Sequence, residues 1–356
     1  MAIDYDTDVP KQFVRERGWL KAALQTSKTI GPGSGLRYLT FCAVEAIDVF
    51  LLDLHDLLDR DPASGKFRDV YFCERGPDAF REISGILGLQ GFLGEFEDIV
   101  LFEEEEGPDT ANLKPLDHEI EASEPQRRRL RVKRSAANFR EAFPFDVINL
   151  DFDGTLFPPQ QPADSRLFQA VKRVIEWQRT PPSGAQGPAE FTLFLTTRVD
   201  RDRFGSEALK VLIDLVEDNV DQDPGFKAGF AKRFSGSPAD VAANDLGPFC
   251  AASLPKQILE DAVHLSWKAQ YRDIFIYRRT PKNGSEYHMV SFVCHFTRMP
   301  KKVSLKAMRD VLAEATAIVA NEPCDVDREL GDSAIRDTLR ANLAAVVEHR
   351  AKATSP

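Results

Sequence analysis

Apolar and polar positions along the chain follow two alternating patterns. Short apolar runs predict strands at residues 36–42, 69–74, 96–102, 145–151 and 190–197. Helical spacing follows most of these runs, at residues 43–58, 77–87, 165–178 and 206–220. Strands that alternate with helices predict βαβ units and a parallel sheet covered by helices on both faces.

The pattern changes at both ends of this region. Residues 10–26 predict an amphipathic helix, 223–268 a helical insert and 303–356 a charged helical tail. Two strands at 271–278 and 287–296 flank a loop with Asn283-Gly284, which is typical of an antiparallel hairpin. The predicted fold is therefore α/β, a doubly wound, mostly parallel Rossmann-like sheet that ends in an antiparallel hairpin. Its predicted parts are an N-terminal helical extension (1–35), the α/β domain with its insert (36–300) and a C-terminal helical segment (301–356).

Bulk composition excludes some classes of protein. The net charge of -10 makes the average surface repel nucleic acid and anionic membranes. No apolar run approaches the roughly 20 residues of a membrane helix, so we expect no membrane partner. The five cysteines lack zinc or redox spacing, which favours reduced thiols and a cytoplasmic location. His288 and His295, seven residues apart on one strand, face opposite sides, so no metal site is predicted.

Parallel βα units closed by a hairpin, over about residues 36–298, resemble the class I S-adenosylmethionine-dependent methyltransferase fold. In that family the cofactor lies at the carboxyl ends of the first, second and fourth strands, in agreement with the rule for doubly wound sheets. The family's turn after the first strand is rich in glycine, whereas residues 41–46 contain none.

The resemblance implies specific cofactor contacts. It places Phe41, Cys42 and Glu45 in the turn after the first strand, and Glu74 as the acceptor for the ribose hydroxyls. It also places Glu103 beside the adenine, at the end of the expected third strand. Residues 103–106 are four consecutive glutamates, a run that favours a solvated acidic loop over the adenine contact.

The segment Asn-Leu-Asp-Phe-Asp-Gly-Thr-Leu ends the fourth predicted strand. It resembles the Asp-Pro-aromatic-Gly-Ser/Thr turn of enzymes that methylate guanine amino groups in transfer RNA. The matching residues are Asp151, Gly154 and Thr155, while Phe152 and Asp153 replace the proline and the aromatic residue. The resemblance implies that Asp151, Asp153 and Thr155 are catalytic. A carboxylate there accepts hydrogen bonds from an exocyclic amine and orients its lone pair toward the methyl donor.

The same segment resembles the first motif of haloacid-dehalogenase-type phosphatases. That resemblance makes Asp151 the nucleophile and Asp153 the general acid, with Mg²⁺ as cofactor and Thr196 or Thr197 as the second motif. The family also needs a later lysine and an acidic pair on parallel strands. Lys268 falls in the predicted insert and Asp332 at a predicted helix start, so the phosphatase is the second hypothesis.

A basic run at residues 127–134 precedes the fourth strand, on a helix expected to pack beside it. Arg128, Arg131 and Lys133 are candidates for contacts to nucleic-acid phosphates, and Arg198, after the fifth strand, for a substrate contact. A solvated helix face is an equal alternative for the run. A third hypothesis is a non-catalytic binding or scaffold module with a protein partner, which the absence of the glycine turn favours.

Overall fold

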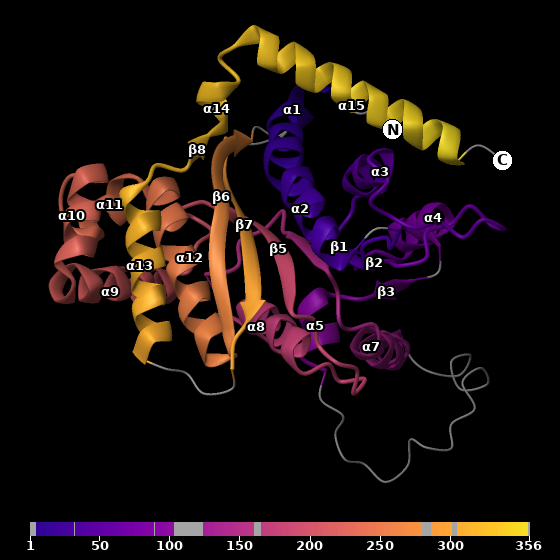
Figure 1. Ribbon diagram of the computed structural model, residues 1–356, viewed down its shortest axis with the longest axis horizontal. Helices are drawn as coiled ribbons and strands as arrows, with labels where there is room; N and C mark the ends of the chain where they lie inside the picture. Colours follow the sequence, from indigo (N-terminus) through magenta and orange to yellow (C-terminus); the bar gives the residue numbers. More distant parts are fainter. Residues whose placement is uncertain are drawn as a thin grey trace.

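The computed structural model describes residues 5–31, 33–88, 90–102, 124–159, 165–279, 286–300 and 305–354. Within them, eight strands form one sheet in the order β3-β2-β1-β4-β5-β7-β6-β8 (Figure 1). The strands are β1 (Tyr38–Thr40), β2 (Val70–Glu74), β3 (Gly91–Leu93), β4 (Val147–Asp151), β5 (Glu190–Val199), β6 (Trp267–Arg279), β7 (Tyr287–Arg298) and β8 (Cys324–Asp325).

Helices cover both faces of this sheet. On one face and above it in Figure 1 lie α1 (Tyr5–Val14), the π-helical segment η1 (Arg15–Leu20), α2 (Lys21–Ile30), α3 (Ile47–Leu54), α4 (Pro77–Leu87) and α15 (Ser333–Thr354). The other face carries α5 (Phe96–Val100), α7 (Glu124–Glu141), α8 (Arg166–Arg179), α9 (Ser206–Gln222), α10 (Pro224–Arg233), α11 (Pro238–Asn244), α12 (Leu246–His264) and α13 (Leu305–Ala320). The four-residue helix α14 (Val326–Glu329) follows β8.

The strand pairing confirms the predicted fold class. Strands β1 to β5 pair in parallel, whereas β7 runs antiparallel between β5 and β6. Strands β2 and β3 extend the sheet to one side of β1, and β4 and β5 extend it to the other side. The order therefore reverses between β1 and β4, where doubly wound sheets bind ligands.

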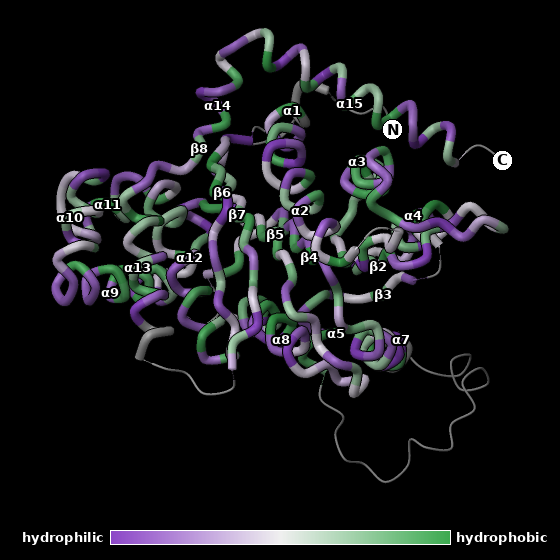
Figure 2. Tube along the Cα trace, viewed as in Figure 1, coloured by the Kyte–Doolittle hydropathy of each residue, from purple (hydrophilic) through white to green (hydrophobic). Residues whose placement is uncertain are grey.

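Each strand sends alternate side chains into two separate cores. Tyr38 and Val147 join the core under α1, α3 and α15, whereas their neighbours Leu39 and Ile148 join the core on the opposite face. Figure 2 shows the hydrophobic residues concentrated in the sheet and in the helices that flank it. Burial on both faces explains why the strands are nearly continuous apolar runs in the sequence.

The N-terminal helices pack directly on the sheet. The ring of Trp19 stacks on Phe194 of β5, with centroids 5.7 Å apart. A Cβ on Gly18 would lie 2.6 Å from the Phe275 ring of β6, so a glycine permits this close approach. The predicted helix at 10–26 is correct in kind but too short, since helical structure runs from Tyr5 to Ile30.

The predicted third strand is wrong in position. Strand β3 is Gly91–Leu93, and Phe96–Val100 forms the helix α5 instead. Phe96, Ile99 and Val100 are buried, a spacing of three and four residues that suits a helix face. The apolar run concealed this period, and a three-residue strand is too short to show its own.

Two further boundaries differ from prediction. The helical insert ends at His264, because Trp267 and Lys268 begin β6. The C-terminal segment, predicted to be helical, also contributes β8, which pairs in parallel with β6. The backbone of this segment thus extends the same sheet as the α/β region.

Among the helices that the structure describes, none combines the length and apolarity needed to cross a bilayer. All five cysteine thiols are free, and four of them are buried.

Candidate functional site

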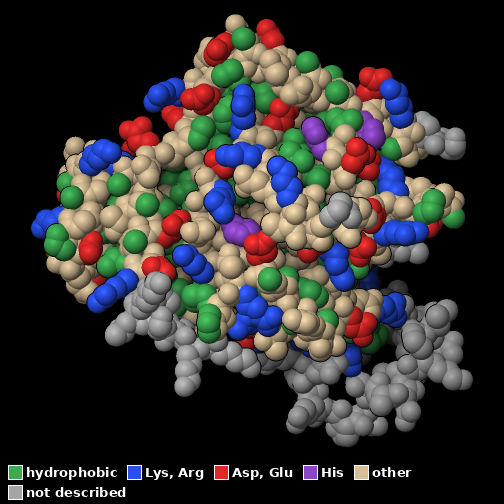
Figure 3. All heavy atoms as spheres, viewed as in Figure 1, with side chains coloured by type: hydrophobic (Ala, Val, Ile, Leu, Met, Phe, Trp, Pro, Cys, Tyr) green, Lys and Arg blue, Asp and Glu red, His purple; other side chains and the backbone are tan. Residues whose placement is uncertain are grey.

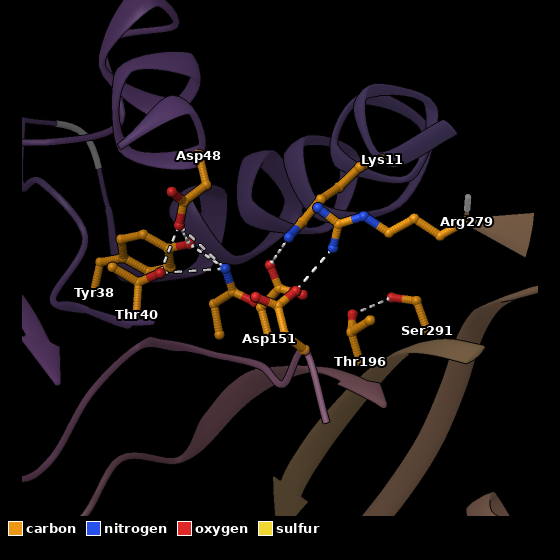
Figure 4. Close-up of polar contacts among 10 residues, drawn as sticks. Lys11, Tyr38, Thr40, Asp48, Asp151, Thr196, Arg279 and Ser291 are labelled. Carbon is orange, nitrogen blue, oxygen red and sulfur yellow. Dashed lines mark hydrogen bonds and ion pairs between the residues drawn. The ribbon is translucent and has the colours of Figure 1, made fainter. Parts of the chain in front are cut away.

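Asp151, the last residue of β4, lies at the carboxyl edge of the sheet (Figure 4). It shares a strand face with Asn149 and so points toward α1, where Lys11 Nζ lies 2.5 Å from Asp151 Oδ2. The two side chains are only 15% and 7% exposed. The other oxygen, Oδ1, is buried and has no hydrogen-bond partner among the described residues. A buried carboxylate oxygen without a donor is costly unless it serves a function.

Asp153 lies two residues further on and faces solvent, with its side chain 79% exposed. Arg279 Nη1, at the end of β6, lies 2.8 Å from Asp153 Oδ1. Burial acts to lower the pKa of Arg279, but Asp153 and nearby tyrosines raise it overall. Burial raises the pKa of the neighbouring Tyr277 phenol, and the charge of Asp151 raises it further. Each motif carboxylate is thus paired with a cation from a distant part of the sequence.

Backbone bonds fix the motif turn against β5. The Arg198 amide donates to Gly154 O at 3.0 Å, and the Leu156 amide donates to Thr197 Oγ1 at 3.0 Å. Thr155 is buried, and its hydroxyl accepts the Phe157 amide at 3.2 Å. The Thr155 hydroxyl is therefore engaged locally, and the turn is held rigidly beside Asp151.

Arg198, a predicted substrate contact, lies at the same edge of the sheet. Its guanidinium carbon is 3.7 Å from the centre of the Tyr287 ring on β7. Its Nε donates to Asp200 Oδ2 at 2.6 Å. The structure therefore brings Asp151, Asp153 and Arg198 to the carboxyl ends of neighbouring strands.

A second buried carboxylate lies under the same edge. Asp48 of α3 accepts hydrogen bonds at Oδ2 from Tyr38 Oη (2.8 Å), Thr40 Oγ1 (2.5 Å) and Asn149 Nδ2 (3.1 Å). All four residues are buried, and Figure 4 shows Tyr38, Thr40 and Asp48 pointing toward one another. Burial and the charge of Asp48 raise the pKa of Tyr38 well above its usual value. The network locks β1 and β4 together at the reversal of strand order.

The turn after β1 carries the predicted cofactor residues. Cys42 is buried, Glu45 is half-buried, and burial raises the pKa of the Cys42 thiol, as does the charge of Asp48. The Phe41 ring packs on Phe96 and Phe152, with centroids 4.9 and 5.2 Å apart. An aromatic cluster therefore covers the edge where a glycine-rich turn would expose backbone.

Glu74, predicted to bind a ribose, is half-buried at the end of β2. Its Oε1 accepts the Gly76 amide at 2.6 Å. Within the described residues, Oε2 accepts no hydrogen bond, so one oxygen remains available for a hydroxyl donor.

The remaining predicted contacts are elsewhere. Helix α7, which carries the basic run, packs against β3 and α5, so the expectation that it lies beside β4 is wrong. Arg128 is exposed, and its Nη2 lies 3.6 Å from Asp98 Oδ2 of α5. Arg131 and Lys133 are half-buried. Glu103 lies outside the described residues.

Of the residues of the phosphatase hypothesis, Thr196 is the register partner of Asp151 across β4 and β5, whereas Lys268 and Asp332 lie away from Asp151. Lys268 lies at the start of β6, at the amino edge of the sheet and so at the edge opposite to Asp151. Its Nζ is 3.8 Å from Asp310 Oδ2. Thr196 Oγ1 is 2.9 Å from Ser291 Oγ, and Asp332 lies between α14 and α15. In the described part of the chain, no three His, Cys, Asp or Glu side chains form a metal-binding group.

Sequence reasoning missed three residues of the site: Lys11, Asp48 and Arg279. Asp48 had a signal, because it is one of two aspartates, with Asp53, in the largely apolar helix Ile47–Leu54. Lys11 and Arg279 had none, because nothing in a single sequence links them to residues 151–153.

Comparison with known proteins gives one relationship. A protein-family model described as PP_RS20740-like matches residues 129–342, which is more than half of the chain. The match includes Asp151, Asp153, Arg198 and Arg279, whereas Lys11 and Glu74 precede it. No curated protein matches, and neither does any solved structure.

Proposed function

The chain belongs to the PP_RS20740-like family, and we propose that it is an S-adenosylmethionine-dependent methyltransferase acting on an amine nitrogen of a nucleic-acid base. We place it in the cytoplasm, where the five free thiols stay reduced.

One observation carries the proposal: the position of Asp151 and the hydrogen bonding of its two carboxylate oxygens. It ends β4 next to the reversal of strand order, where this class of sheet binds its ligands. Lys11 holds one carboxylate oxygen, and the other is buried without a donor among the described residues. An N–H group of an acceptor amine supplies the donor that Oδ1 lacks.

The residues fit the ribose end of an adenosyl cofactor. At the end of β2, Glu74 has one carboxylate oxygen that accepts no hydrogen bond from the described residues, and a charge-assisted bond to a hydroxyl is stronger than a neutral one. The aromatic cluster of Phe41, Phe96 and Phe152 gives an apolar wall in place of a glycine turn. S-adenosylmethionine, when bound, supplies a methyl group on a sulfonium, which is electrophilic.

The protein's own residues then orient the acceptor. An acceptor N–H donates to Asp151 Oδ1, and this bond directs the nitrogen lone pair away from the carboxylate. Asp151 Oδ1 would then accept the proton that the acceptor nitrogen loses on methylation. Lys11 keeps the carboxylate fixed in this geometry.

Isothermal titration with S-adenosylhomocysteine tests the proposal. Wild-type protein should bind, and Glu74→Gln should bind roughly tenfold more weakly because a charge-assisted bond is lost. Asp151→Asn should keep this binding but lose methyl transfer to an amine-bearing base. Asp221→Asn, on the exposed end of α9, is the control. Absence of binding by folded wild-type protein would refute the proposal.

A second candidate is a non-catalytic binding module. The packing of Phe41 on Phe96 and Phe152 favours it, because these rings cover the edge that a bound cofactor would approach. It predicts no heat of binding with S-adenosylhomocysteine. It also predicts no change in that result when Phe41→Ala uncovers the edge.

A further inference from the structure

The first helix of the chain closes Asp151 off from solvent. The side chain of Asp151 is 7% exposed, and that of its partner Lys11 on α1 is 15% exposed. The second carboxylate oxygen, Oδ1, is buried and has no donor among the described residues. A ligand atom therefore reaches this oxygen only when α1 or the side chain of Lys11 moves away from the end of β4.

Helix α15 holds α1 in this position. The two helices pack against each other, and α15 runs above α1 and α3 (Figure 1). Glu16, in the π-helical segment that continues α1, links them. Its Oε1 accepts a hydrogen bond from Gln12 Nε2 of α1, and its Oε2 accepts one from Asn342 Nδ2 of α15, both of 2.8 Å. One carboxylate thus connects the helix that carries Lys11 to the helix above it.

The same helix contacts the turn after β1. Arg350 Nη2 donates to Val44 O in this turn at 3.4 Å, and His349 Nε2 lies 2.7 Å from Asp53 Oδ2 of α3. Helix α15 also packs along α3, which follows the turn. Because the turn lies at the carboxyl end of β1, α15 spans two parts of the candidate site, one at α1 and one at residues 41–46.

Few buried side chains hold α15 on the protein. Of its 22 residues, only Leu339, Leu343 and Val346 are buried, in one stripe with spacings of four and three. Thirteen of the 19 residues of α12 are buried. Charged side chains of both signs lie over α15 on the face drawn in Figure 3. Elements with few buried apolar contacts open at a lower free energy than the rest of a fold, so α15 opens more readily than α12.

From these contacts we infer that α15 is a strap over the candidate site, and that a ligand enters when this strap moves away from α1 and from the turn after β1. In the closed state Lys11 occupies Asp151, and Arg350 occupies the turn. In the open state α1 has lost its link to α15, and Asp151 becomes accessible. The inference rests on the proposed function for the identity of the ligand only, because the movement itself requires no methyl transfer.

The thiol of Cys42 detects this movement. It lies in the turn after β1, it is free and buried, and burial raises its pKa, so it is unreactive while the strap is closed. Cys250 is an internal control, because it is buried in α12 within the other core. Labelling with N-ethylmaleimide, followed by mass spectrometry of the peptides, measures the reaction rate at each thiol.

The test variant is His349→Ala/Arg350→Ala, which removes contacts of α15 to α3 and to the turn after β1. Labelling of Cys42 should become roughly tenfold faster, because hydrogen bonds of ordinary strength are lost from the closed state alone. Labelling of Cys250 should not change.

The matched control is Glu348→Ala/Lys352→Ala, an exposed ion pair of 2.7 Å within α15, which should label at the wild-type rates. If the test variant does not fold, Asn342→Ala, which removes the hydrogen bond to η1, takes its place with the same expectations. Unchanged labelling of Cys42 in the test variant, or an equal rise in the control, would overturn the inference. So would an equal rise at both thiols, because it shows global unfolding.

The association rate of S-adenosylhomocysteine, measured by surface plasmon resonance, separates the two proposals. The test variant should bind it faster than the wild type does. Faster labelling of Cys42 with an unchanged association rate would overturn the inference, because α15 would then move without controlling entry. Faster labelling in a protein that binds no S-adenosylhomocysteine would uphold the strap for a different ligand and refute the methyltransferase.

Discussion

Lys11 and Asp151 form an ion pair of 2.5 Å between the first helix of the chain and the end of its fourth strand. Both side chains are almost completely buried. The pair attaches α1 to the carboxyl edge of the sheet and leaves the other carboxylate oxygen, Oδ1, buried without a donor among the described residues. Structure and proposed function therefore depend on the same contact.

Lys11→Met should lower the free energy of unfolding by about 3 kcal/mol, because it leaves a buried carboxylate without its counter-charge. Urea denaturation measures this loss as a lower midpoint. The double variant Lys11→Met/Asp151→Leu should recover most of it, because no buried charge remains. If the double variant is no more stable than Lys11→Met, the pair is not what the single substitution disrupts.

Asp48→Ala should also destabilise the fold, by about 3 kcal/mol, because Tyr38, Thr40 and Asn149 lose their shared acceptor. Bonds from Asn149 Nδ2 to the two hydroxyls remain and limit the loss. Chemical denaturation is the measurement, with the exposed Asp221→Asn as control. A loss below about 1 kcal/mol, typical of a surface change, would contradict the network's role.

Two glycine substitutions should have opposite effects. Gly18→Ala should destabilise by about 2 kcal/mol, because its Cβ would meet Phe275 and Val293. Gly85→Ala should stabilise by about 1 kcal/mol, because Gly85 is inside α4 with open space around it. Differential scanning calorimetry compares the two variants, and a Tm of Gly18→Ala at or above that of the wild type would contradict the packing of η1 on β6.

His295 should make stability depend on pH. Burial lowers the pKa of His295 below its ordinary 6.5, and Arg272 lowers it further, against the opposing effect of Glu190. The unfolded chain therefore binds the proton more readily than the folded protein. The stability that neutral His295 provides is present above the unfolded value and is lost as the pH falls through the folded value.

Thermal unfolding at about pH 7.5 and about pH 5 measures this dependence. The Tm should fall toward the lower pH, and His295→Gln should reduce that fall. His288→Gln, on the exposed side of the same strand, is the matched control and should leave it unchanged. An identical fall in wild type and His295→Gln would show that other groups cause the pH dependence.

The sequence pattern predicted the fold class because buried strands and amphipathic helices differ in hydrophobic period. The helix at Pro77–Leu87 was predicted with its observed bounds, since Pro77 begins it and Gly88 follows it. Strand β3 was misplaced because three residues carry no measurable period, and the apolar helix α5 beside it resembled a strand. Strand β8, with two residues, was missed for the same reason.

For the candidate site, the sequence by itself identified Asp151, Asp153, Glu74 and Arg198, because each lies at or just beyond a predicted strand end, and parallel strands bring those ends to one edge. Only the tertiary structure determined their partners. Lys11 and Arg279 reach the motif because α1 packs across the sheet and β6 returns parallel to β5, and neither relation leaves a local pattern. Local periodicity encodes the elements, whereas long-range packing decides which charges meet.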